Sequence, residues 1–270
     1  MATTLYVNTP ELDAISAVIQ EAVAEVAHAF DRAGTGNQMP LSDTAVSPAV
    51  LDQALSRFLD VLQRVDNDRG DSPSRVLPVK PTCDSINKPV LNRAKLSAAA
   101  NQGLQLLETL SEWASSLGLP RQENQIKTVM VMTALWVARH GGELETIESV
   151  VNTLAEIANA TTEQQELAEL SYMMGELAYA ISGQTKFDFE NAERHRPWRV
   201  LNLNRGITAT RSHDTRIMEN AFDDLIRNIP EDAESFFRQG VQQTEQLDYP
   251  DHVRNVVFRY YRESKSRAVH

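Results

Sequence analysis

The sequence has few of the features that indicate a compartment, a disulfide framework or a reaction. Its 270 residues contain one cysteine, Cys83, so no internal disulfide can form. The most apolar run, Val129 to Ala138, is far shorter than the roughly 20 residues that a membrane-spanning helix needs. The opening residues, MATTLYVNTPELDAISAVIQ, lack the basic start and continuous apolar centre of a secretory signal. We therefore expect a cytoplasmic protein without a membrane span.

Motifs of the common enzyme classes are also missing. The sequence has no glycine-rich phosphate loop, no GxSxG nucleophile motif and no HExxH zinc motif. One ExxH match, Glu25 to His28, has the spacing used in di-iron bundles, but such a site needs a second copy and the chain has none. Cys83 lies in a proline-rich segment with no sign of a helix N-terminus that would activate a thiol. No metal site, cofactor or catalytic residue is predicted, and catalysis ranks last among the possible functions.

Basic residues are scarce in the middle of the chain. The net charge is −11, and residues 91–190 carry 6 Lys and Arg against 13 Asp and Glu, whereas residues 191–270 carry 13 against 12. No Lys or Arg lies between Arg139 and Lys186. The glutamates of that interval form an acidic block: Glu143, Glu145, Glu148, Glu156, Glu163, Glu166, Glu169 and Glu176. An acidic block thus comes directly before an arginine-rich stretch.

The chain does have the hydrophobic spacing that is typical of α-helices. Two N-terminal segments begin with helix-start signals, the Thr9–Pro10 and Ser47–Pro48 pairs, and each continues with apolar residues three or four positions apart. We expect these segments to form a helical hairpin over residues 1–66. Residues 67–89 are rich in Pro, Asp and Ser and show little periodicity, which predicts a linker.

The remaining residues, 90–270, are predicted to form the main helical domain. At least seven helical segments are expected, approximately at 90–117, 122–140, 143–159, 162–183, 212–228, 230–246 and 248–264. Short loops favour antiparallel neighbours, and the last three helices start about eighteen residues apart, which gives helix pairs the spacing of helical-repeat solenoids. The tetratricopeptide pattern is met only near Gly175 and Ala192, so no family is assigned. The predicted fold is all-α, with antiparallel helix pairs in a bundle or a short TPR-like superhelix.

The best candidate site is the arginine stretch RHRPWRVLNLNRG at 194–206, with its continuation to Arg216. We interpret it as a semi-irregular segment. A guanidinium is a planar fork of donors that suits phosphate or carboxylate, and a tryptophan can stack on a base or on a guanidinium. The candidate binding residues are Arg194, Arg196, Trp198, Arg199, Arg205, Arg211 and Arg216.

The alternative is that these arginines pair with the glutamate block at 143–176 and hold the last helices against the middle ones. The acidic net charge favours this alternative, because a nucleic-acid binder usually has a net basic domain.

Two further segments have competing interpretations. The methionine- and tyrosine-rich segment at 172–179 is predicted to be core, because methionines fill irregular gaps between helices. The C-terminal segment after Pro250 has an apolar stripe and a basic side. It is predicted either to cap the helical domain or to dock a partner through its basic side and exposed Tyr260 and Tyr261.

Three functions remain open. The first is a non-catalytic interaction or scaffold module that binds an acidic protein or peptide through a helical groove or the arginine stretch. The second is a regulator that binds nucleic acid or a phosphorylated ligand at residues 194–216. The third is a helical enzyme with dispersed residues, in which His195, His213 and Asp214 would be tested first. The sequence specifies neither the partner nor the oligomeric state.

Overall fold

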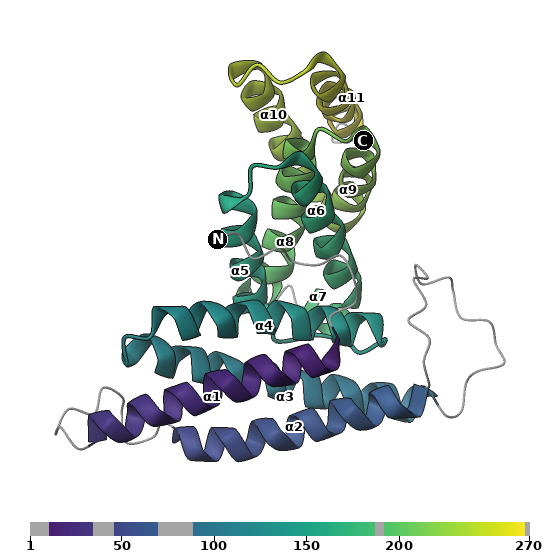
Figure 1. The fold of residues 1–270 in the computed structure, drawn as a ribbon. Helices are drawn as coiled ribbons and strands as arrows, with labels where there is room; N and C mark the ends of the chain where they lie inside the picture. Colours follow the sequence, from purple (N-terminus) through teal and green to yellow (C-terminus); the bar gives the residue numbers. More distant parts are fainter. Residues whose placement is uncertain (1–10, 35–45, 70–88, 187–191, 268–270) are drawn as a thin grey trace. The chain divides into compact units, whose positions relative to one another are not determined.

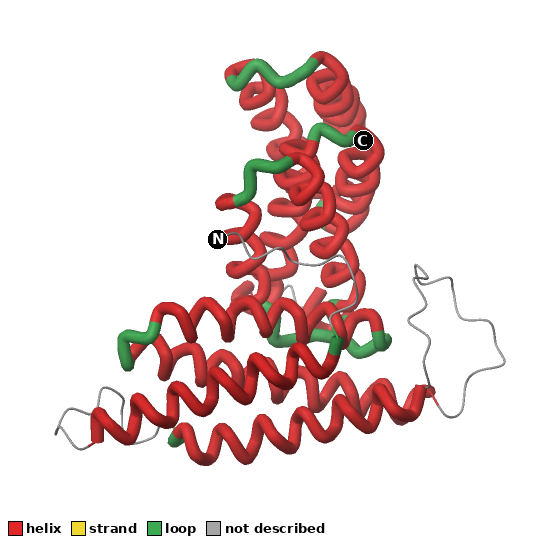
Figure 2. Tube along the Cα trace, viewed as in Figure 1, coloured by secondary structure: helices red, strands yellow, loops and turns green. Residues whose placement is uncertain are grey.

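The computed structural model describes residues 11–34, 46–69, 89–186 and 192–267, and nearly all of them are α-helical (Figures 1 and 2). No β-strand forms within these ranges. The helices are α1 (Leu12–Gly34), α2 (Pro48–Arg69), α3 (Pro89–Ser116), α4 (Pro120–Arg139), α5 (Glu148–Ala160), α6 (Gln164–Ala180), α7 (Gly183–Lys186), α8 (Ala192–Ser212), α9 (Thr215–Asn228), α10 (Pro230–Gln246) and α11 (Asp251–Arg267). The predicted all-α fold is confirmed. Within the same ranges, no helix combines the length and the apolar character required to span a bilayer.

The chain divides into two compact units, Asn8–Thr153 and Leu154–His270. The division falls inside α5. The sequence predicted a linker at residues 67–89. Most of that predicted linker lies outside the described residues.

In the first unit, α1 packs on α2 and α4, and α3 packs on α2 and α4, so the four helices lie side by side (Figure 1). The helices of the predicted hairpin are thus in contact with α3 and α4. Gly103 of α3 permits a close approach, because the ring of Phe58 occupies the position that a β-carbon there would need. Trp113 packs edge-to-face on Phe30 with 5.0 Å between ring centroids, and its indole N–H donates to the carbonyl of Val46 at 2.9 Å.

In the second unit, α8 packs on both α6 and α9, while α10 and α11 pack on each other and on α9. The core of the last three helices is aromatic. Phe222 of α9 packs edge-to-face on Phe237 at 5.0 Å and on Tyr260 at 5.1 Å between centroids. Both Phe222 and Phe237 are fully buried. Edge-to-face pairs align the positive ring edge with the negative ring face, which stabilises this cluster beyond simple burial.

The helix α8 was missed by the sequence prediction, which treated its residues as semi-irregular; that interpretation is wrong. The cause is the composition of its buried face, which includes Asn202, Arg205, Thr208 and Ser212 beside apolar residues. Pro197 lies in its second turn and further weakens the helical signal. Hydrophobic periodicity indicates such a helix poorly, because polar residues interrupt the apolar positions of its inner face.

Candidate functional site

Six of the seven candidate residues lie on α8, and Arg216 lies in the first turn of α9. The backbone of Arg194 belongs to α8, but its side chain lies outside the described part of the structure. The other candidates fall into two groups, those engaged inside the second unit and those exposed at its surface.

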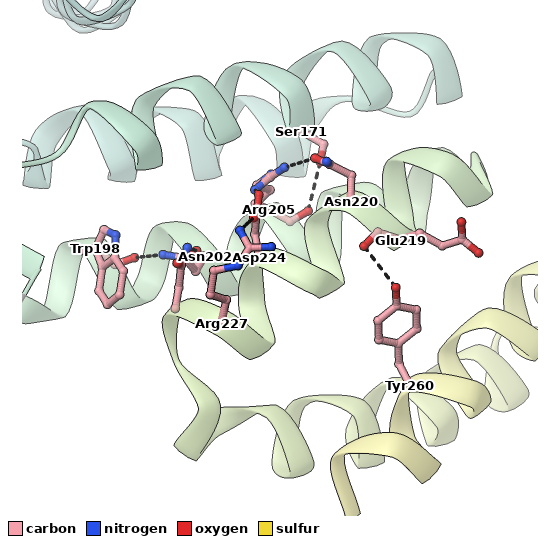
Figure 3. A network of polar contacts seen from close by, with 10 residues as sticks. Ser171, Trp198, Asn202, Arg205, Glu219, Asn220, Asp224, Arg227 and Tyr260 are labelled. Atoms are coloured by element: carbon pink, nitrogen blue, oxygen red, sulfur yellow. Dashed lines mark hydrogen bonds and ion pairs between the residues drawn. The ribbon is translucent and has the colours of Figure 1, made fainter. Parts of the chain in front are cut away.

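Arg205 is the centre of a buried polar network, shown in Figure 3. It is 5% exposed, and its Nη1 pairs with Oδ2 of Asp224 at 2.5 Å. Its Nη2 donates to Oδ1 of Asn220, and its backbone carbonyl accepts from the hydroxyl of Ser171 at 3.3 Å. The side chain therefore links α8 to α9, and its backbone links α8 to α6. A guanidinium enclosed in this way is not accessible to an external ligand.

Gly175 of α6 makes room for this guanidinium. A β-carbon at position 175 would lie 2.8 Å from Cζ of Arg205, which is closer than real β-carbons approach any heavy atom. The Nε of Arg205 is buried and has no acceptor among the described residues. The guanidinium is thus held at its two terminal nitrogens and packed against the backbone of α6.

Trp198 is also part of the core, because it is only 4% exposed. Its backbone carbonyl accepts a 2.9 Å hydrogen bond from the side-chain amide of Asn202 (Figure 3), and the Oδ1 of Asn202 accepts from Asn228 at 2.8 Å. An indole in this position cannot act as a stacking platform for a nucleobase unless the core opens.

Arg199 and Arg211 contact other helices of the same unit. Arg199 makes a two-nitrogen contact with the carboxylate of Asp232 on α10, and this hydrogen bonding raises the pKa of Arg199. Arg211 donates from Nη1 to the carbonyl of Ala158 and from Nη2 to that of Thr161, both at 2.6 Å. These carbonyls end α5, where the helix dipole favours a cation. Arg211 therefore caps the C-terminus of α5.

The acidic partners of Arg199 and Arg205 differ from the partners that the sequence suggested. They are Asp232 and Asp224, which follow the arginines in the chain, rather than members of the glutamate block. The internal pairing that we considered thus occurs for these two arginines, but it joins α8 to α9 and α10.

Two of the candidate arginines remain at the surface. Arg196 and Arg216 are exposed, and neither makes an ion pair with a residue in the described ranges. Arg196 shares one side of α8 with apolar residues at helical spacing, so we define the α8 outer face as Arg196, Val200, Leu203 and Ile207. Ile207 is 49% exposed, and Val200 and Leu203 are half-buried. This face combines an exposed cation with an incompletely covered apolar stripe.

The residues proposed for catalysis do not assemble into a reactive group within the described ranges. His213 has a left-handed backbone (φ of 58°), and its Nδ1 lies 2.9 Å from the side-chain nitrogen of Gln164. Burial and the neighbouring His252 lower the pKa of His213. Asp214 accepts the N–H groups that begin α9, so its carboxylate serves as a helix cap. The side chain of His195 lies outside the described part, and no metal-binding cluster of His, Cys, Asp and Glu occurs in the rest.

A shallow cleft of about 310 Å³ lies between α9 and α11. It is lined by Asp223, Ile226, Arg227 and Glu263 and is partly open to solvent. Asp223 accepts a 2.7 Å hydrogen bond from the hydroxyl of Tyr260, which is 5% exposed. Tyr260 thus lies on the buried apolar stripe of α11, and the alternative in which an exposed Tyr260 docks a partner does not hold for this residue.

Comparisons of the chain with protein-family models, with curated proteins and with solved structures find no match. The function must therefore be inferred from the residues of the chain itself.

Proposed function

We propose that the chain is a non-catalytic interaction module that binds an acidic segment of another protein on the α8 outer face. The observation that carries the proposal is the placement of the exposed Arg196 at the end of an apolar stripe that reaches the half-exposed Ile207. Arginine is one of the residue types that concentrate binding energy in protein interfaces, and the apolar stripe beside it adds surface that a partner can bury. A cytoplasmic location is part of the proposal, since a single cysteine fits a reducing compartment.

The chemistry of the face favours an amphipathic acidic partner. Val200, Leu203 and Ile207 would receive apolar side chains, while carboxylates of the partner would meet Arg196 and the exposed part of Arg199. The side chain of Arg199 is 49% exposed even though its guanidinium pairs with Asp232, so it remains accessible to a partner. Apolar contact would supply affinity, and the charges would supply orientation and association rate.

The α8 outer face is a weaker match for nucleic acid. Trp198 is buried, Arg205 is enclosed by Asp224 and Asn220, and Arg211 caps α5. These residues are therefore not available to neutralise phosphates or to stack on bases, which nucleic-acid binding requires.

The experiment is a fluorescence-anisotropy titration with a fluorescein-labelled acidic amphipathic peptide. Arg196→Glu and Ile207→Asp should each raise the Kd at least about tenfold, which corresponds to about 1.4 kcal/mol. Arg262→Glu reverses an exposed cation on α11 and is the matched control, expected to leave the Kd nearly unchanged. Circular dichroism checks that all three variants fold.

Two outcomes would overturn the proposal. One is equal binding of the acidic peptide by the wild type and by both α8 variants. The other is tighter binding of a labelled DNA duplex than of the peptide, with an affinity that falls steeply as salt is added, because each phosphate neutralised releases a counterion.

A further inference from the structure

The methionine- and tyrosine-rich segment at 172–179, which the sequence assigned to the core, has a buried side and an exposed side in the structure. The buried side of α6 includes Met173 and Met174, which are at most 1% exposed, as predicted. Tyr172 and Tyr179 do not follow that prediction, because they are 48% and 68% exposed. Two large aromatic rings on one helix are thus left at the surface.

These tyrosines belong to a regular row of side chains. Gln165, Glu169, Tyr172, Glu176 and Tyr179 follow one another four or three positions apart, which places them along one side of α6. We call this row the α6 stripe. In it, carboxylates alternate with aromatic rings. A lysine or arginine lying beside Glu169 and Tyr172 would meet a negative charge and a ring face in turn.

A cation already lies against one end of the stripe. The Nζ of Lys186 lies 5.8 Å from the centroid of the Tyr179 ring and donates to the carbonyl of Tyr179 at 3.0 Å. This contact is a cation–π arrangement, in which an ammonium is attracted to the negative face of a ring. No other Lys or Arg occurs between Arg139 and Lys186, so α6 itself supplies no cation to the stripe.

We propose that the α6 stripe binds a lysine- and arginine-rich segment of another protein, with cations placed over Tyr172 and Tyr179 and beside Glu169. The site goes beyond the function proposed above, because it lies on a different helix and selects a partner of the opposite charge. Charge complementarity identifies the occupant. A second copy of the chain that docked stripe to stripe would bring carboxylates against carboxylates, which is unfavourable.

The test uses a fluorescein-labelled peptide, about as long as α6, with Lys or Arg at every third or fourth position. The wild-type chain should bind it with an affinity that weakens as salt is added, because exposed charge pairs are screened. The double variant Tyr172→Ala/Tyr179→Ala should weaken binding at least about tenfold, and Glu169→Gln about threefold. Tyr179→Phe should bind like the wild type, since it keeps the ring.

A matched control tests whether the basic peptide binds the α6 stripe or any exposed aromatic ring. Phe258 of α11 is 50% exposed, which is close to the exposure of Tyr172, so Phe258→Ala removes a comparable ring elsewhere. It should leave the affinity for the basic peptide unchanged. Arg196→Glu should not weaken this affinity either, so failure here is distinguishable from failure of the acidic-partner proposal.

The proposal is overturned if the double tyrosine variant, shown to be folded by circular dichroism, binds the basic peptide as tightly as the wild type. It is also overturned if a peptide with Glu in place of Lys and Arg binds equally well at the stripe. A dimer seen by sedimentation and abolished by the tyrosine substitutions would identify a second copy as the occupant and would equally refute the assignment.

Discussion

Gly175 and Arg205 face each other across the contact between α6 and α8, and a β-carbon on residue 175 would lie within 2.9 Å of the Nε and Nη2 atoms of Arg205. The guanidinium cannot yield easily, because Asp224 and Asn220 hold it. We predict that Gly175→Ala lowers the free energy of unfolding by about 1–3 kcal/mol, despite the better helix propensity of alanine. Urea denaturation measures this loss.

Gly183→Ala is the control for this prediction. No heavy atom lies within 4 Å of the position that its β-carbon would take. Its unfolding free energy should stay within about 0.5 kcal/mol of the wild type. A Gly175→Ala variant as stable as Gly183→Ala would show that the α6–α8 contact is looser than described.

The ion pair between Arg205 and Asp224 should contribute more than a surface pair. Its arginine side chain is 7% exposed and its aspartate 27%, so Asp224→Ala leaves a buried cation with reduced compensation. We expect a loss of about 2–4 kcal/mol, somewhat below the usual range for fully buried pairs. Arg227→Ala removes the other, 71% exposed partner of the same aspartate and should cost under about 1 kcal/mol. Equal losses in chemical denaturation would contradict this ranking.

Arg211 should stabilise the end of α5 in a way that lysine cannot reproduce. Its two terminal nitrogens reach two separate carbonyls, those of Ala158 and Thr161. Arg211→Met should cost about 1–3 kcal/mol, and Arg211→Lys should recover only part of this because an ammonium lacks the planar fork. Hydrogen exchange should show faster exchange of amides in the last turn of α5. Full recovery by lysine would mean that charge alone matters.

The stability of the chain should depend on the ionisation of Tyr260 at high pH. Burial, together with the hydrogen bond to Asp223, raises the pKa of Tyr260 in the folded state. The unfolded chain releases this proton near its ordinary pKa of about 10, so stability is complete below that pH and falls as the pH rises above it. Tyr260→Phe should remove this part of the alkaline loss while costing about 1 kcal/mol at neutral pH. Thermal denaturation of both proteins between neutral and alkaline pH tests this, and parallel curves would count against it.

Helices with an apolar inner face could be predicted from the sequence. In α2, the residues Leu51, Leu55, Phe58 and Leu62 are all buried; their spacing indicated a helix, and the Ser47–Pro48 pair indicated its start. In α8, by contrast, Asn202 and Arg205 are buried only because Asn228 and Asp224 satisfy them from another helix. A local pattern does not record a partner on a distant segment, so this helix stayed hidden.

The candidate surfaces could be predicted only in part, for the same reason: a local pattern does not record contacts with distant segments. The arginine-rich composition pointed to residues 194–216, but which arginines face outward depends on the rotation of α8, which its polar contacts determine. For α6, the composition of the 172–179 segment suggested core, whereas in the structure Met173 and Met174 are buried and Tyr172 and Tyr179 are exposed. Composition located both segments but did not show which of their side chains are accessible.

The polar inner face of α8 also restricts how this helix can move. A shift of α8 by one helical turn would separate Arg205 from Asp224 and Asn202 from Asn228 together. Such a shift would leave the buried Arg205 guanidinium and the buried Asn202 amide without these partners. The polar pairs between α8 and α9 therefore fix the register of one helix against the other.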